Sequence, residues 1–378
     1  MENYTEKMDD RLWEKAEEFD ETENYEVVTR FLNNKNEFQS FGEGLTYLIN
    51  KKYPETGGSD LLKFIKNSCE KNNVAMSEVA SNNTLKNWFY TDIRPKKSDA
   101  SRNSMFALAF ALMLNEKETI DLFHKVFLDR AFNNRSAEEI IFYYCIKHKK
   151  SWKDAKQMTQ LIDDKSNTDL DKTIYSKDIR NDIDSISDEA ELLSYINNHS
   201  NNFRKNNVHA ECEKNKLLLE VKELAIQEIA LPEHESQFDG RQKGDKSLSN
   251  NLLYEILTEI KVSANTGTRT VFQNARLPKE IKNRFPESNS FCKNNLTSEE
   301  LRKVIILLFS YKTWYMVQWE GANYGIEDYT VELNQLLIEC NYPLLYSGNP
   351  FDWLFLFCTQ DSRPLDAFRG IIQEVLEE

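Results

Sequence analysis

Polar and basic side chains follow one another between residues 82 and 102 in an order that suits contact with DNA. At helical spacing, residues 81 to 90 place Leu85, Trp88 and Phe89 on one buried face. The opposite face then presents a polar row to a major groove: Asn82, Asn83, Lys86 and Asn87, with Thr84 as a further candidate DNA contact at the start of the helix. An asparagine amide can pair bidentately with adenine, and basic side chains contact the backbone phosphates. We expect the phosphate contacts from the basic residues that follow: Arg94, Lys96, Lys97 and Arg102.

The whole chain carries a formal net charge of −14, which repels nucleic acid, so any contact with DNA must be made by a local basic stretch. Residues 81–104 hold five basic and two acidic side chains, whereas residues 1–30 hold eleven acidic and four basic ones. A second basic stretch contains Lys147, Lys149, Lys150, Lys153 and Lys156. For either stretch taken alone, a solvated helix face is a sufficient explanation.

Residues 74–114 resemble the helix-turn-helix of the phage-repressor-like (XRE-type) regulators. Val74 and Ala75 stand where that family has Leu-Ala, Ser81 stands at the cap of the second motif helix, and Thr84-Leu85 begins its buried face. Arg94-Pro95 marks the following turn, and a closing helix follows with packing residues at Phe106, Ala109, Leu112 and Leu114. The resemblance implies a DNA-binding module. It departs from the family at Val79, because the usual residue of the turn is a glycine, which tolerates positive φ.

The strongest enzymatic candidate is the pair Arg204 and His209, an Rx4H spacing similar to the active-site motif of HEPN-type ribonucleases. In that family the two side chains act on an RNA backbone near a helix start. A solvated helix start explains the same residues without catalysis. The signatures GxxxxGK[ST], HExxH, GxSxG and GxGxxG are absent from the sequence, so enzyme function is less favoured than binding.

Composition excludes several other classes of protein. His209 and Cys212 are too few ligands for a zinc site, so we predict no metal and no cofactor. The six cysteines are far apart, which favours reduced, buried thiols over disulfides. No apolar run approaches the roughly 18 residues of a membrane span, and the N-terminus lacks the features of a signal peptide. We therefore expect a cytoplasmic protein that does not contact membranes.

Scarce Gly (11) and Pro (8) and recurrent 3.6-residue spacing predict an all-α protein. We divide it into an acidic helical segment (1–40), a helix-turn-helix-like domain (41–165) and a C-terminal helical domain (175–378), because residues 163–169 are polar and aperiodic. Thr297 and Glu300 form a predicted capping box that begins a long aromatic helix ending near Gly321.

Residues 132–162 can be aligned with residues 345–375, which suggests a repeated helical unit. In this alignment Glu139 meets Asp352, Phe142 meets Phe355 and Cys145 meets Cys358. We expect both cysteines to be inaccessible. The helix that follows should pack back through Ala155 and Met158 in one copy and Phe368 and Ile371 in the other. The shared periodicity of helical hairpins is the alternative explanation.

The last 46 residues also resemble C-terminal segments of uncharacterised proteins from low-GC Gram-positive bacteria, a resemblance that implies no chemistry. The favoured hypothesis is a bacterial DNA-binding regulator, or a protein of a mobile element or phage-defence locus, with double-stranded DNA as partner. The alternatives are an all-helical protein-interaction protein, with a protein partner or a second copy as ligand, and a HEPN-like ribonuclease of abortive-infection type.

Overall fold

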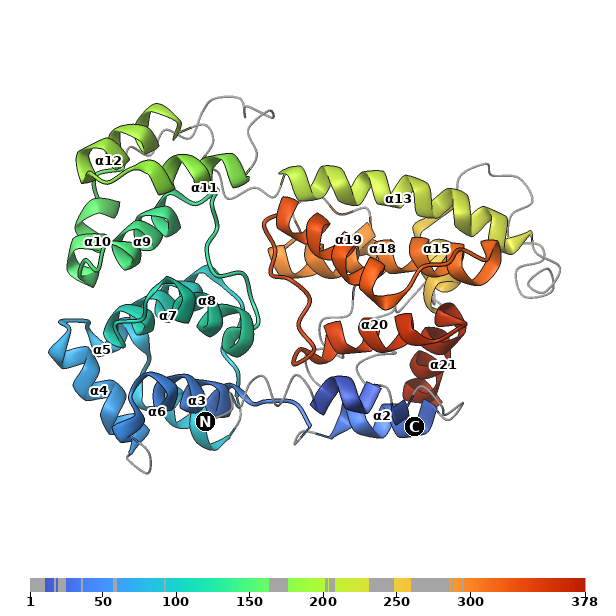
Figure 1. Ribbon diagram of the computed structural model, residues 1–378, viewed down its shortest axis with the longest axis horizontal. Helices are drawn as coiled ribbons and strands as arrows, with labels where there is room; N and C mark the ends of the chain where they lie inside the picture. Colours follow the sequence, from blue (N-terminus) through green and yellow to red (C-terminus); the bar gives the residue numbers. More distant parts are fainter. Residues whose placement is uncertain are drawn as a thin grey trace. The chain divides into compact units, whose positions relative to one another are not determined.

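The structure is a computed structural model, and every regular element that it describes is helical (Figure 1). This confirms the predicted all-α class. None of these helices is long and apolar enough to cross a membrane. The described residues are 11–16, 18–19, 25–34, 37–56, 60–91, 93–162, 176–200, 203, 208–230, 248–259, 286, 288–291, 293 and 296–377.

The described helices form two compact units. Unit 1 consists of Met1–Phe38, Asn207–Leu337 and Leu344–Glu378, and unit 2 of Gln39–Asn206 and Ile338–Pro343. The predicted boundaries differ from this division, and the predicted break at residues 163–169 lies outside the described residues. The segment 176–200 belongs to unit 2, because its isoleucines and leucines complete that core. The acidic N-terminal segment belongs to unit 1, where the indole of Trp353 donates to the carbonyl of Leu12 at 2.9 Å.

Unit 2 is a bundle of short helices around α7, whose residues 105–111 are all buried. Its helices are α3 (Phe41–Lys52), α4 (Leu61–Lys71), α5 (Met76–Val79), α6 (Asn82–Tyr90), α7 (Asp99–Ala111), α8 (Glu116–Asp121), α9 (Ala137–Lys147), α10 (Trp152–Thr159), α11 (Ser176–Ser185) and α12 (Glu189–Asn198). A short 3-10 turn, η1 (Pro54–Thr56), follows α3, and α8 passes directly into a π-helical turn, η2 (Leu122–Phe127).

Three corners of unit 2 share one backbone design. The α4–α5, α7–α8 and α9–α10 corners each place a residue in the left-handed region: Asn73 (φ 54°), Met113 (φ 49°) and Lys149 (φ 55°). In each corner the next amide donates back to a carbonyl of the preceding helix, as Lys150 N does to Cys145 O at 2.8 Å. The N-cap of the following helix stands two residues after the left-handed one. These corners satisfy the free carbonyls of the preceding helix and redirect the chain.

Unit 1 is arranged around the long helix α18, buried over most of its length. Its elements are α2 (Tyr25–Asn33), α13 (Val208–Ile229), α15 (Asn250–Thr258), η4 (Ser288–Phe291), α18 (Ser298–Glu320), α19 (Ile326–Glu339), α20 (Pro350–Gln360) and α21 (Pro364–Glu377). The predicted capping box at Thr297 and Glu300 is present, and α18 ends at Gly321 with φ 67°. Both sequence predictions for this helix are confirmed.

The two aligned segments form the same pair of helices, α9–α10 and α20–α21. Helices α9 and α20 have the same length and begin and end at aligned residues. Cys145 and Cys358 are fully buried, as predicted. The second helix packs back in both copies: Cys145 Sγ lies 3.8 Å from Met158 Sδ, and the rings of Phe355 and Phe368 are 5.4 Å apart.

The aligned acids Glu139 and Asp352 each form a buried ion pair with an arginine of an earlier long helix, although the two arginines are not themselves at aligned positions. Arg102 of α7 binds Glu139 with Nε–Oε1 2.9 Å and Nη2–Oε2 2.7 Å. Arg302 of α18 binds Asp352 with Nη1–Oδ1 2.7 Å and Nη2–Oδ2 2.8 Å. Each arginine also donates to an aligned carbonyl, that of residue 131 or of residue 344. Each acid accepts an amide six residues before it, from residue 133 or residue 346. Shared helical periodicity does not explain this buried network, which supports an internal duplication.

The cysteines differ in exposure, and this allows a direct chemical test. Cys69, Cys145, Cys340 and Cys358 are buried, Cys212 is exposed on α13, and Cys292 lies outside the described residues. The prediction of buried thiols is therefore wrong for Cys212. This residue lies opposite the buried face of α13, which contains Ala210, Lys214 and Leu217.

We expect a thiol reagent at pH 8 to modify Cys212 in the native protein and the four buried cysteines only after unfolding. Burial raises the pKa of the Cys69 thiol to about 11 and that of Cys145 to about 12, and the thiolate is the reactive form. Peptide mass spectrometry identifies the labelled site, with Cys212→Ser as control. Rapid native labelling of Cys145 would contradict the packing of α9 against α10.

Candidate nucleic-acid interface

Helix α6 is held in place by its apolar face and by its N-terminal cap. Leu85 and Trp88 are 0% and 3% exposed, and the Trp88 ring meets Phe41 of α3 edge-on at 5.1 Å. The Ser81 hydroxyl accepts the amide of Thr84 at 3.1 Å, so the predicted cap is confirmed. Helices α3 and α6 approach closely at Gly42, where an added Cβ would lie 2.3 Å from the Trp88 carbonyl oxygen. The buried face of α6 is therefore fixed.

The opposite face of α6 carries the polar row that the sequence predicts. Asn82, Asn83 and Lys86 are exposed, while Thr84 and Asn87 are half-buried. The predicted exposure is confirmed for Asn83 and Lys86 and is partial for Asn87. Phe89 is half-buried rather than buried. The amides and the ammonium group are therefore accessible on a helix whose other side is anchored.

The turn between α5 and α6 has a backbone conformation that does not require glycine. Val79 ends α5, and the next two residues are extended: Ala80 has φ −168° and Ser81 has φ −69°. No residue from 74 to 91 has positive φ, so a β-branched residue is tolerated at position 79. Helix α5 consists of only four residues, and Ala75 is its exposed N-cap. The closing helix is buried at Phe106, Ala109 and Leu112 as expected, and so is Leu114 just beyond it.

A side chain from α10 positions α5. The indole of Trp152 donates to the Glu78 carboxylate of α5 at 2.8 Å, and Trp152 itself is 4% exposed. Glu78 is half-buried and Trp152 is buried, and the hydrogen bond between them connects the short helix α5 to the core of unit 2. The position of α5 and of the turn before α6 thus depends on residues far along the chain.

The basic residues that follow α6 separate into accessible and structural side chains. Lys96 is exposed and Lys97 is half-buried. Arg94 is half-buried and donates to two backbone carbonyls, that of Val126 and that of Gln39, the latter at 3.0 Å. Its guanidinium therefore joins loops of unit 2.

The assignment of Arg102 to a phosphate contact is wrong, because the structure buries this side chain. Arg102 is 6% exposed and contacts two carboxylates, Glu139 and Asp129, the latter at 2.7 Å. Burial would raise the pKa of Asp129, but the adjacent guanidinium outweighs this effect and lowers it. A basic residue on the inner face of a helix binds buried acids, and the sequence alone did not reveal that Glu139 would be its partner.

The structure does not test the predicted catalytic pair, Arg204 and His209. Arg204 lies outside the described residues, and His209 is half-buried in the first turn of α13 in unit 1. Among the described residues, no group of three His, Cys, Asp or Glu side chains could hold a metal ion. The Rx4H assignment remains a sequence prediction.

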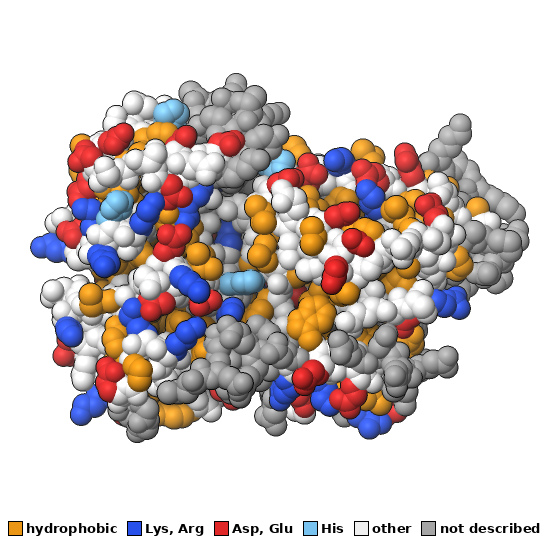
Figure 2. All heavy atoms as spheres, in the orientation of Figure 1, with side chains coloured by type: hydrophobic (Ala, Val, Ile, Leu, Met, Phe, Trp, Pro, Cys, Tyr) orange, Lys and Arg blue, Asp and Glu red, His pale blue; other side chains and the backbone are white. Residues whose placement is uncertain are grey.

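On the face shown in Figure 2, Lys and Arg side chains alternate with Asp and Glu. The face drawn therefore has no large area of basic side chains alone. Comparison of the chain with protein-family models, with curated proteins and with solved structures gave no match. Function must therefore be inferred from the residues themselves.

Proposed function

We propose that this protein binds double-stranded DNA by inserting the N-terminal part of α6 into the major groove. The observation that carries the proposal is the accessible row Asn82, Asn83 and Lys86 on a helix anchored by Leu85 and Trp88. Asn83 is the candidate base-reading residue, because its amide can pair bidentately with adenine. Lys96 follows α6 and is exposed, which makes it a candidate for a phosphate contact.

The distribution of charge predicts how this binding responds to salt. Arg94 and Arg102 are engaged inside unit 2, and Lys97 is half-buried and interacts with Asp129, so Lys86 and Lys96 are the accessible candidates for phosphate contacts. The logarithm of the association constant should then fall against the logarithm of salt concentration with a slope of about −2. Affinity should be weak at physiological salt, since the net charge of −14 opposes the approach of DNA.

Fluorescence anisotropy with fragments of the source genome tests the proposal. Lys96→Ala should lower affinity equally for all duplexes and reduce the magnitude of the salt slope by about 1, whereas Asn83→Ala should relax the sequence preference. Lys153→Ala is the control, because Lys153 is an exposed lysine on α10 that plays no part in the proposed interface. Unchanged binding by both the Lys96 and the Asn83 variant would remove this surface as the DNA contact. Absence of binding to any duplex would favour a protein-interaction role.

A further inference from the structure

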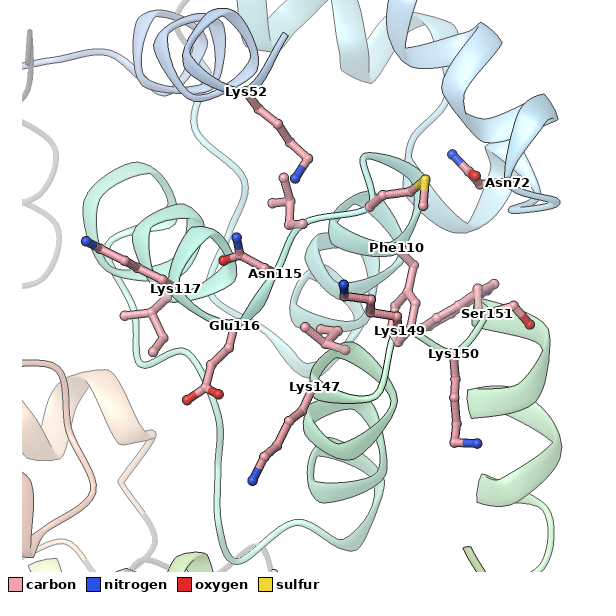
Figure 3. Close-up of a pocket in the computed structure, with 15 residues that line it drawn as sticks. Lys52, Asn72, Phe110, Asn115, Glu116, Lys117, Lys147, Lys149, Lys150 and Ser151 are labelled. Carbon is pink, nitrogen blue, oxygen red and sulfur yellow. The ribbon is translucent and has the colours of Figure 1, made fainter. Parts of the chain in front are cut away.

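Unit 2 contains a half-open pocket of about 870 Å³ that the DNA proposal does not use. Figure 3 shows it between the end of α3, the α7–α8 corner and the α9–α10 corner. Its floor is apolar and includes Phe110, Ile146 and Trp152. A volume of this size is within the range of small-molecule sites, and a mainly apolar wall with a few polar groups is their usual composition.

Five lysines line the pocket, together with a single carboxylate, Glu116. Three of these lysines have acidic partners: Lys52 binds Glu118, Lys147 binds Asp184 and Lys150 binds Glu189. In Figure 3 Lys147 and Lys150 point away from Lys52, whereas Lys149 extends toward the middle of the space.

The charge that remains at the pocket is positive. Glu116 is itself neutralised by Arg180 at 2.6 Å. Within the part of the chain that the structure describes, Lys117 and Lys149 have no acidic partner, and both are exposed. Both lysines line the pocket, but in Figure 3 only Lys149 extends into it, whereas Lys117 points away from Lys149.

The backbone is left-handed at two of the residues that line the pocket. Lys149 (φ 55°) and Met113 (φ 49°) both adopt the left-handed conformation, and both line this pocket. Helix corners usually place Gly or Asn there, because other side chains are strained by about 1 kcal/mol or more. The α4–α5 corner does have asparagine, Asn73. Leu128 and Glu259 adopt the same conformation outside the pocket, so the value of this backbone is that glycine can replace Lys149 or Met113 without strain.

The aligned segment of unit 1 forms the same pair of helices without a lysine at this corner. In the second copy the α20–α21 corner begins at Asp361, whose backbone is extended, and Ser362 stands at the position aligned with Lys149. No residue of that corner has positive φ. Both copies keep the buried arginine–carboxylate pair, but only the copy in unit 2 has the lysine corner.

We propose that this pocket binds a phosphorylated organic molecule of the nucleoside-phosphate class. Ammonium groups bind phosphate as point charges, and Lys149, whose side chain extends into the space in Figure 3, would hold the phosphates. The apolar side of the pocket, with Met113 at its rim, would hold the organic part. The proposal is independent of DNA binding by α6.

Isothermal titration of the full chain with ATP, and separately with inorganic pyrophosphate, tests this proposal in the absence of DNA. ATP should bind more tightly than pyrophosphate, because only ATP uses the apolar floor. Lys149→Gly should weaken ATP binding about tenfold or more. The same variant should melt at an unchanged or higher temperature, because glycine accepts φ 55° without strain. A purely structural role for Lys149 cannot produce lower affinity together with undiminished stability.

Two further variants complete the test. Met113→Gly should weaken the binding of ATP but not that of pyrophosphate, and Lys153→Ala should change neither, because Lys153 does not line the pocket. The proposal is overturned if ATP does not bind at millimolar concentration, if Lys149→Gly binds as the wild type does, or if pyrophosphate binds as tightly as ATP. It is equally overturned if single-stranded oligonucleotides bind through Lys149 while ATP does not.

Discussion

Replacing Arg302 by alanine should lower the free energy of unfolding by about 3–5 kcal/mol, the usual effect of removing one partner from a buried ion pair. Arg302 is 6% exposed and Asp352 is 1% exposed, so the variant leaves a carboxylate without its counter-ion inside unit 1. The carbonyl of Leu344 also loses a donor at 3.1 Å. Urea denaturation followed by circular dichroism measures the change. The corresponding change in unit 2, Arg102→Ala, should be at least as harmful, because it removes the partner of two carboxylates, Glu139 and Asp129.

An exposed ion pair in the same unit is the matched control. Arg363 and Asp366 lie 2.7 Å apart with side chains 63% and 37% exposed. Arg363→Ala should change the unfolding free energy by about 1 kcal/mol or less, because water screens this pair. Replacing both Arg302 and Asp352 by leucine should be less harmful than Arg302→Ala alone, since no buried charge then remains. Equal losses for Arg302→Ala and Arg363→Ala would show that the buried pair has no special structural role.

Truncation of Phe355 to alanine should destabilise unit 1 by about 3–5 kcal/mol, the usual effect of emptying a buried aromatic site. Phe355 is 0% exposed, and its ring stacks on Trp314 of α18 at 5.6 Å. It also contacts Phe368 of α21 at 5.4 Å, so one side chain joins three helices. Thermal and urea unfolding both report this loss.

Val331→Ala on α19 is the control for this variant, because Val331 is 68% exposed in the same unit. Its unfolding free energy should lie within about 0.5 kcal/mol of the wild type. A loss of less than about 1 kcal/mol for Phe355→Ala would mean that the α18–α20–α21 core rearranges to fill the site. The packing of the second copy would then not be a stabilising feature of unit 1.

Local sequence patterns predicted much of this protein correctly. Helical periodicity identified the all-α class and the two faces of α6, because a 3.6-residue repeat shows directly which side chains share a face. Caps such as Ser81 and Thr297 were predictable because their hydrogen bonds close within three residues. The alignment of residues 132–162 with 345–375 identified equivalent buried positions, because both segments repeat one order of polar turns and apolar helices.

Only the tertiary structure determined which distant residues meet. Arg102 resembled an exposed phosphate contact, but Glu139, 37 residues away, makes it a buried partner. The second basic stretch resembled a solvated helix face, yet the α9–α10 corner places Lys149 beside residues of α3, α7 and α8 in a pocket. The domain boundaries also depended on remote contacts, such as that of Trp353 with Leu12. Periodicity and caps act within a few residues of the chain. Ion pairs, pockets and units join residues far apart in sequence, and local patterns do not encode which of them become neighbours.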